Sequence, residues 1–212
     1  MSARNPKLSV RLIPEILHRL QGGEVVLLPT ATTYALVGNA SDMGAIARIR
    51  QLKQQSSSEP LALFARLDTI DRFARPNADA RALIAKFPYP VTLVLPKTDE
   101  APEGVTAGFD SLLVCCPDEF IYQLVGESPF PLACASASIS SDLKATNCRA
   151  AVQLFGDRVS FIVDGGSSKY GRGGTMVDCT LDRPTILKYG PVSVDDLRPI
   201  VPNVELPSHM RK

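Results

Sequence analysis

The chain has 212 residues, of which 45% are hydrophobic and 21% are charged, and its formal net charge at pH 7 is +1. This composition is ordinary for a globular protein with one sizeable core. The small net charge argues against a protein whose overall field attracts nucleic acid or a membrane surface. No stretch approaches the roughly 20 apolar residues that a membrane-spanning helix needs, and the N-terminal residues lack the apolar core of a signal peptide.

The first part of the chain predicts a helix followed by a buried strand. Apolar residues recur with helical spacing over 12–21, and a Gly-Gly pair ends the pattern. Residues 25–28 then form an apolar run of strand length that Pro29 closes. Thr30, Thr32 and Tyr34 follow directly. Because ligands of open α/β sheets bind at the carboxyl ends of strands, we expect these hydroxyls to form the floor of a site.

The rest of the chain alternates short helices with short apolar strands. The patterns predict helices over 43–53, 67–74, 78–87, 119–125, 145–155 and 193–197. They predict strands over 61–65, 91–95, 111–116, 132–137, 159–163, 176–179 and 185–188. This alternation predicts a single α/β domain over 1–198, a twisted mixed sheet of parallel and antiparallel strands with flanking helices, followed by a mobile tail over 199–212.

The sequence contains an odd number of cysteines and no CxxC spacing, which argues against a disulfide framework. They are Cys115, Cys116, Cys134, Cys148 and Cys179. Several lie in apolar segments, where cysteine behaves as a small hydrophobic residue, so we expect free thiols in a reducing cytoplasm. The two histidines, His18 and His209, are far apart in sequence, and we therefore expect no zinc site.

Four polar stretches follow predicted strands and could bind anions. They span 30–34, 53–59, 136–146 and 165–175 and are rich in Ser, Thr, Gly and Lys, which supply donors to phosphate or carboxylate oxygens. The sequence has no P-loop and no GxGxxG after a strand. No histidine lies near Ser136 or Ser138 to form a hydrolase triad. These patterns assign no catalytic residue.

The adjacent Cys115 and Cys116 lie in a predicted strand and should point to opposite faces of the sheet. One of them then belongs to the core, and the other faces a cleft or solvent. A thiol nucleophile that hydrolyses an acyl or phosphoryl compound is one hypothesis for the exposed residue. Such a residue needs a lowered pKa and a neighbouring base, and the sequence identifies neither.

Seven stretches, taken in order, resemble the motifs of the YrdC/YciO family and together span about 12–192. They are PTATTYAL (29–36), LKQQSSSEPLALFA (52–65), FPYPVTLVLP (87–96), FDSLLVCCPDE (109–119), PLACASASISSDLKAT (131–146), GGTMVDCT (173–180) and ILKYGPV (186–192). The resemblance implies a twisted sheet around a concave surface. It also implies synthesis of threonylcarbamoyl-AMP from L-threonine, bicarbonate and ATP, for threonylcarbamoyladenosine formation in tRNA. Mg²⁺ is then expected to enter with ATP.

Matching these motifs residue by residue implies a binding site for nucleotide and threonine. Its residues are Thr30, Thr32, Tyr34, Lys53, Cys115, Ser136, Ser138, Thr146, Thr175 and Lys188. Lys53 matches the family lysine that contacts nucleotide phosphates, and Ser136 matches its binding serine. Each position also has a structural alternative: turns that bond their own backbone around Thr30 and Ser136, a helix cap at Thr146, and ordinary strand positions at Thr175 and Lys188.

The departures from the family pattern remove cations and one amide. Gln55 stands where the family has an arginine, Cys115 replaces a strand arginine, and Ser138 replaces an asparagine. One lost charge-assisted contact costs about 1.5–3 kcal/mol. Two hypotheses follow. The chain either synthesises threonylcarbamoyl-AMP or is a divergent, YciO-like paralogue that binds nucleotide, tRNA or double-stranded RNA without synthase activity.

Overall fold

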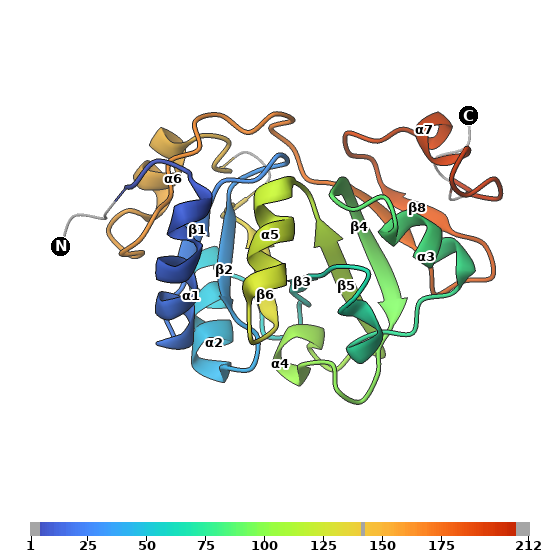
Figure 1. Cartoon of the computed structure of the whole chain (residues 1–212), viewed down its shortest axis with the longest axis horizontal. Coiled ribbons are helices and arrows are strands. Elements are labelled where there is room, and N and C mark those ends of the chain that lie inside the picture. Colours follow the sequence, from blue (N-terminus) through green and yellow to red (C-terminus); the bar gives the residue numbers. More distant parts are fainter. Residues whose placement is uncertain (1–4, 141–142, 207–212) are drawn as a thin grey trace.

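The computed structural model describes residues 5–140 and 143–206, and its centre is one eight-stranded sheet (Figure 1). The strands follow the order β1-β2-β6-β3-β5-β4-β7-β8 across the sheet. Their bounds are β1 Val26–Leu28, β2 Ala35–Asn39, β3 Ala62–Phe64, β4 Tyr89–Pro96, β5 Ser111–Cys116, β6 Leu132–Ser136, β7 Thr175–Asp178 and β8 Thr185–Lys188. The β3–β5 and β4–β7 pairs are parallel and the other pairs are antiparallel, which confirms the predicted mixed sheet.

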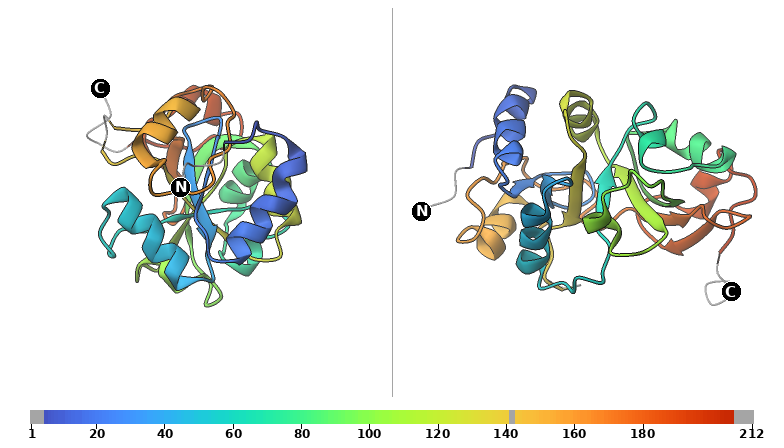
Figure 2. Two further views of the ribbon diagram at one scale, coloured as in Figure 1. Left: turned by 90° about the vertical axis from the view of Figure 1, so that its left-hand side faces the viewer. Right: turned by 90° about the horizontal axis from the view of Figure 1, so that it is seen from below.

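Helices cover both faces of the sheet (Figure 2). Their bounds are α1 Ile13–Gln21, α2 Met43–Lys53, α3 Ala78–Ile84, α4 Glu103–Thr106, α5 Glu119–Glu127, α6 Cys148–Phe155 and α7 Val194–Leu197. In Figure 2, α1, α3 and α5 lie on one side of the strands, and α2 and α6 lie on the other. The sheet is therefore enclosed near β1 and β2, where its residues are buried on both faces.

Local capping explains where α2 begins and ends. The Asp42 carboxylate accepts hydrogen bonds from the backbone N–H groups of Gly44 and Ala45, at 2.8 and 3.3 Å. Gln54 then takes the left-handed conformation, with φ of 55°, and stops the helix. As a result, Lys53 occupies the last turn of α2.

The structure corrects the sequence-based elements in four places. The hydroxyl cluster is the turn of a hairpin, because β2 follows it and pairs antiparallel with β1. The sequence patterns also do not predict the short helix α4. Residues 67–74, which they predict as a helix, contain only a 3-10 turn over Ile70–Arg72, because the Thr69 hydroxyl bonds the backbone of Arg66 instead. Residues 159–163 form no strand: Ile162 makes a single bridge to Leu27.

The segment after residue 199 begins packed against the sheet. Val201 and Val204 are buried, and the backbone N–H of Glu205 donates to the carbonyl of Pro184 at 2.8 Å. Of the tail that the sequence predicts over 199–212, residues 207–212 lie outside the described residues. Over the described ranges, no helix combines the length and apolar character that crossing a membrane requires.

Candidate functional site

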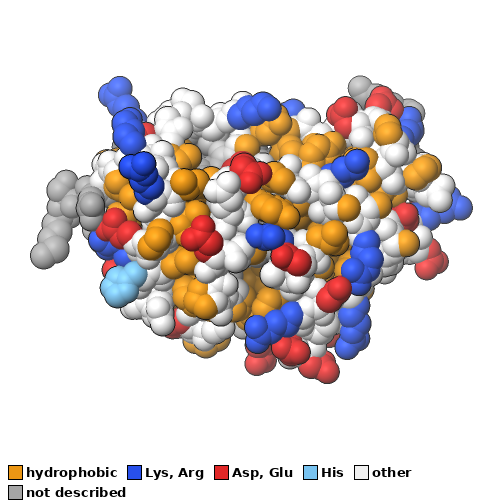
Figure 3. Space-filling view, viewed as in Figure 1, with side chains coloured by type: hydrophobic (Ala, Val, Ile, Leu, Met, Phe, Trp, Pro, Cys, Tyr) orange, Lys and Arg blue, Asp and Glu red, His pale blue; other side chains and the backbone are white. Residues whose placement is uncertain are grey.

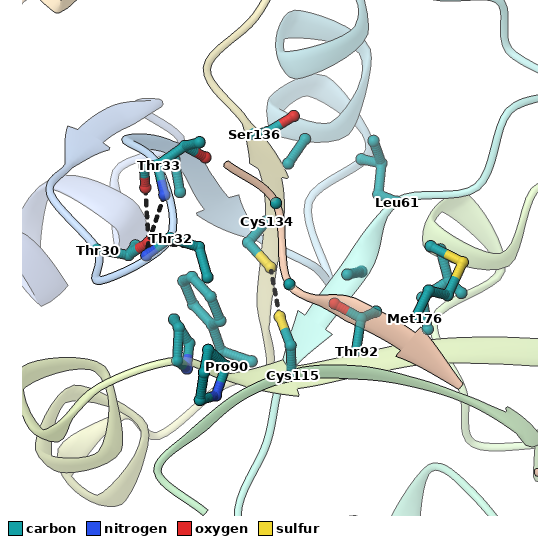
Figure 4. Close-up of a pocket in the computed structure, with 18 of the residues that line it drawn as sticks. Thr30, Thr32, Thr33, Leu61, Pro90, Thr92, Cys115, Cys134, Ser136 and Met176 are labelled. Carbon is teal, nitrogen blue, oxygen red and sulfur yellow. Dashed lines mark hydrogen bonds between the residues drawn. The ribbon is translucent and has the colours of Figure 1, made fainter. Parts of the chain in front are cut away.

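A cavity of about 260 Å³ opens on one face of the sheet, and alternate residues of neighbouring strands line it (Figure 4). Side chains two residues apart in a strand point to the same face, which explains the spacing. The alternating strand residues that line it are Ala35 of β2, Ala62 and Phe64 of β3, Pro90 and Thr92 of β4, Leu113 and Cys115 of β5, Cys134 and Ser136 of β6, Met176 of β7 and Lys188 of β8, and the intervening Val91 and Ala135 also border it. Lys53 of α2, the turn after β1 and loop residues within 55–61, at 117 and at 173–174 form the rest of the wall.

The turn after β1 is held by the Thr30 hydroxyl. Thr30 Oγ1 donates to the carbonyl of Thr33 at 2.6 Å and accepts from the N–H groups of Thr32 and Thr33 at 3.2 and 3.3 Å. Thr30, Thr32 and Thr33 all line the cavity. Thr32 Oγ1 lies 2.9 Å from Thr30 Oγ1, but Thr32 is half-buried whereas Thr30 and Thr33 are buried, so Thr32 is the residue of this turn that is better placed to contact a ligand.

Asp118, which the sequence patterns do not single out, fixes the same turn from a distant segment. Its carboxylate accepts from the backbone N–H of Ala31 at 2.8 Å and from that of Ile121 at 3.0 Å, where it caps α5. Burial raises the pKa of the Asp118 carboxyl, although these backbone N–H groups favour its charged form. The position of Asp118 just before a short helix is the signal in the sequence that marks it as a cap.

Replacing Asp118 by alanine should therefore loosen both the turn and α5. We expect the free energy of unfolding to fall by about 1–3 kcal/mol, because two backbone N–H groups lose their acceptor. Chemical denaturation measures this loss, with Asp99→Ala as the matched control at an exposed acid. Equal stability of the two variants would show that Asp118 does not hold the turn.

Lys53, Ser136 and Ser138, which the family resemblance implies for the site, lie next to one another. Lys53 Nζ donates to the carbonyl of Ser136 at 2.8 Å and to the carbonyl and hydroxyl of Ser138, both at 3.2 Å. The two serine hydroxyls lie 3.1 Å apart. Burial lowers the pKa of the Lys53 ammonium, and the Glu59 carboxylate partly opposes this effect. Lys53 and Ser136 line the cavity, and Ser138 supports them from outside its lining.

Gln55 presents an acceptor to the cavity at the position where the resemblance places a cation. Its amide Nε2 donates to Glu59 Oε2 at 2.9 Å. Its carbonyl Oε1 is buried and has no hydrogen-bond partner among the described residues. This wall of the cavity therefore offers an unused acceptor and a nearby carboxylate, where a guanidinium would offer several donors.

Two thiols lie on the floor of the cavity (Figure 4). Cys115 Sγ and Cys134 Sγ are 3.8 Å apart, while Cys116 is fully buried on the opposite side of β5. This confirms that the adjacent cysteines divide between cavity and core. Burial raises the pKa of the Cys134 thiol, and among the residues that the structure describes no histidine lines the cavity to act as its base. The hypothesis of a thiol hydrolase gains no support.

Besides Ser138, three of the predicted residues lie outside the cavity lining: Tyr34 and Thr146 bond the loop over 164–174, and Thr175 bonds the turn over 190–192. The Tyr34 hydroxyl donates to the carbonyl of Gly166 at 3.0 Å and accepts from the N–H of Gly165 at 3.1 Å, and burial raises its pKa to about 12. The carbonyl of Thr146 accepts from the N–H of Ser168 at 2.7 Å. Thr175 is fully buried, and its hydroxyl bonds the backbone of residues 190 and 192.

Lys188 differs from these three residues because it lines the cavity. It has no ion pair or side-chain hydrogen bond with the parts of the chain that the structure describes. Gly173 and Gly174, at the end of the loop that Tyr34 and Thr146 anchor, lie on the same wall. The cavity therefore has one engaged cation, Lys53, and one free cation, Lys188, within the described residues.

Comparison with known proteins identifies the family. A family model named Sua5_yciO_yrdC, described as "Telomere recombination", matches residues 18–190. The chain belongs to the Sua5/YciO/YrdC family. The resemblance read from the seven motifs is thereby confirmed, and the matched region contains each residue of the cavity wall described above.

Two relatives of the chain are named threonylcarbamoyl-AMP synthase. The chain is 29% identical over 191 residues to threonylcarbamoyl-AMP synthase of Pyrococcus abyssi, and the alignment covers 88% of this chain and 56% of that protein. It is 30% identical over 187 residues to the synthase of Bacillus subtilis, and this alignment covers 86% of this chain and 54% of the relative. The chain thus spans about half the length of these relatives.

The fold of the family is visible in two crystal structures. That of P. abyssi Sua5 complexed with L-threonine superposes with a TM-score of 0.86 at 26% identity, over 97% of this chain and 62% of that one. That of Escherichia coli YciO superposes with a TM-score of 0.77 at 22% identity, over 93% of this chain and all of YciO, and shows the shared fold.

Proposed function

We propose that this chain binds ATP and L-threonine in the cavity and joins them with bicarbonate into threonylcarbamoyl-AMP, which serves tRNA modification in the cytoplasm. The observation that carries the proposal is the Lys53 ammonium, held 2.8 Å from the Ser136 carbonyl on the cavity wall. Relatives named threonylcarbamoyl-AMP synthase and the threonine complex of P. abyssi Sua5 support the same substrates.

The residues of the cavity suit a reaction that depends on position and charge. The threonine amine and bicarbonate first form a carbamate with loss of one water; the carbamate oxygen then attacks the α-phosphorus of ATP and pyrophosphate leaves, so negative charge must be neutralised along the phosphates. Lys53 and Lys188 supply cations on the wall, and the Thr32 and Ser136 hydroxyls supply polar groups that can bond a substrate. We infer that Lys53 contacts the phosphates and that Ser136 and Thr32 position the substrates.

Mg²⁺ fits this scheme as a companion of the nucleotide. Within the ranges 5–140 and 143–206, no three His, Cys, Asp or Glu side chains gather to hold a metal ion. Mg²⁺ is commonly bound through substrate phosphates and water with few protein ligands. We therefore propose that it enters with ATP, while the protein supplies the surrounding lysines and hydroxyls.

The direct test mixes the purified chain with ATP, L-threonine and bicarbonate and measures pyrophosphate and threonylcarbamoyl-AMP by mass spectrometry. We expect both products to form together and to require all three substrates. Pyrophosphate release that does not depend on threonine, or the absence of threonylcarbamoyl-AMP, would refute synthase activity for this chain.

The alternative is a nucleotide-binding paralogue with weakened or lost synthase activity. It is favoured by Gln55, whose amide is tied to Glu59, and by Cys115, because neither can replace a bidentate arginine. Calorimetry with ATP, AMP, tRNA and double-stranded RNA separates the alternatives. The formal net charge of only +1 favours a nucleotide over extended RNA as the ligand, and basic and acidic side chains are interspersed on the face that Figure 3 shows.

The affinity for ATP should depend on pH through Lys53. Binding to phosphate needs the charged ammonium, and burial lowers the pKa of this group in the free protein. The affinity should therefore be highest at lower pH and fall as the pH rises through that lowered pKa, below the ordinary lysine value of about 10.4. Calorimetry across this range should show the fall in the wild type. Lys53→Ala should bind ATP weakly and show no such fall. An identical pH profile in the two proteins would contradict the role of Lys53.

A further inference from the structure

We propose that Cys115 and Cys134 form a two-thiolate site for a soft divalent cation of the zinc or cadmium type on the floor of the cavity. The two sulfurs lie 3.8 Å apart, and both residues line the cavity (Figure 4). Cys115 is half-buried, so an ion entering the cavity can reach it. This site is independent of the proposed synthase activity.

The sheet brings these sulfurs together from two strands that are not adjacent. Cys115 of β5 pairs with Phe64 of β3, and Cys134 of β6 pairs with Ala62 on the other side of β3. Neighbouring strands are about 4.8 Å apart, so two strands separated by a third are about 9–10 Å apart. A disulfide needs Cα atoms within about 7 Å. The arrangement therefore disfavours a disulfide between the two cysteines unless the backbone moves.

A metal ion fits the same arrangement without movement. Zinc–thiolate bonds of about 2.3 Å in tetrahedral geometry place the two sulfurs about 3.8 Å apart. That separation equals the one in the structure. On β3, which separates the two cysteines, Ala62 is opposite Cys134 and Phe64 is opposite Cys115, and all four residues line the cavity. The geometry matches a bridging ion of this size.

The surroundings leave room for further ligands. The described residues provide no third His, Cys, Asp or Glu at this point, so two coordination positions would be filled by water or by a carboxylate of a bound ligand. Binding breaks two S–H bonds, forms two S–metal bonds and releases two protons to solvent, with no change in oxidation state. Since burial raises the pKa of Cys134, protons should compete with the metal more strongly as the pH falls.

The ordinary alternative is that the two thiols merely pack against each other as small hydrophobic groups. The two interpretations differ in what happens when a soft ion is added to the reduced protein. A packed thiol pair binds the ion no better than any other partly exposed cysteine of the chain. A two-thiolate site binds it with both sulfurs at once.

The test uses Cd²⁺ alone, titrated into the reduced full chain and followed by the ultraviolet sulfur-to-cadmium charge-transfer band. We expect one equivalent to bind. Cys115→Ser and Cys134→Ser should each weaken binding at least about tenfold, since even residues that only support metal ligands contribute that much. Cys148→Ser, at a half-buried cysteine outside the cavity lining, is the matched control and should bind like the wild type.

Nuclear magnetic resonance of ¹¹³Cd on the wild type gives a second test that does not require any variant to fold. Its chemical shift reports the number of thiolates on the ion, and two are expected. A shift typical of one thiolate or none would overturn the proposal. So would binding that Cys148→Ser abolishes while Cys115→Ser and Cys134→Ser, shown to be folded by circular dichroism, retain it.

Discussion

Lys53→Met is expected to lower the rate of pyrophosphate release by about 10²–10³-fold, the usual effect of removing one charged or polar group that stabilises a transition state. Lys53 is the cavity cation that the structure holds in place, through the carbonyls of Ser136 and Ser138. Methionine fills a similar volume but carries no charge and donates no hydrogen bond. The variant therefore loses the interaction with the phosphates, and the carbonyls of Ser136 and Ser138 lose this donor.

Two further variants separate charge from structure. Lys53→Arg keeps a cation and hydrogen-bond donors and should recover part of the rate, although its planar fork differs from an ammonium. Lys86→Met removes a lysine that is exposed outside the cavity lining and should match the wild type. If Lys53→Met released pyrophosphate at the wild-type rate, the proposed role of Lys53 would be wrong.

The sequence predicts the sheet better than it predicts the roles of the hydroxyls. Apolar runs mark most strands because burial on a sheet face demands them. A threonine, by contrast, looks the same whether its hydroxyl faces a ligand or the backbone. The Thr30 hydroxyl bonds the backbone of its own turn, and the Thr175 hydroxyl bonds the backbone of residues 190 and 192. Only the three-dimensional structure reveals these partners.

Contacts between distant segments explain the residues that were missed. Asp118 holds the N–H of Ala31, which lies 87 positions earlier in the sequence. Cys115 and Cys134 meet only because both pair with β3, so their approach depends on the register of three strands. A single sequence contains no signal for such a register, whereas the cap at Asp118 could have been read from its place before a helix.

Thr175→Val is expected to lower the free energy of unfolding by about 3–5 kcal/mol, since each buried polar group left without a partner costs about 1–3 kcal/mol. The Thr175 hydroxyl donates to the carbonyl of Val192 at 2.7 Å and accepts from the N–H groups of Gly190 and Val192 at 3.1 and 3.0 Å. A Cβ on Gly190 would lie 2.2 Å from the Thr175 nitrogen, so the packing leaves little room for a water to replace the hydroxyl.

The matched variant Thr175→Ser keeps the hydroxyl and loses one methyl group, and it should cost only about 0.8 kcal/mol. Chemical denaturation of both variants, with ATP affinity measured on the folded protein, distinguishes the two interpretations of this residue. If Thr175 contacts ligand, as the family resemblance implies, valine should weaken binding and leave stability nearly unchanged. If it holds the turn over 190–192, valine should lower the free energy of unfolding. Affinity then falls only because Lys188, two residues before that turn, is no longer fixed on the cavity wall.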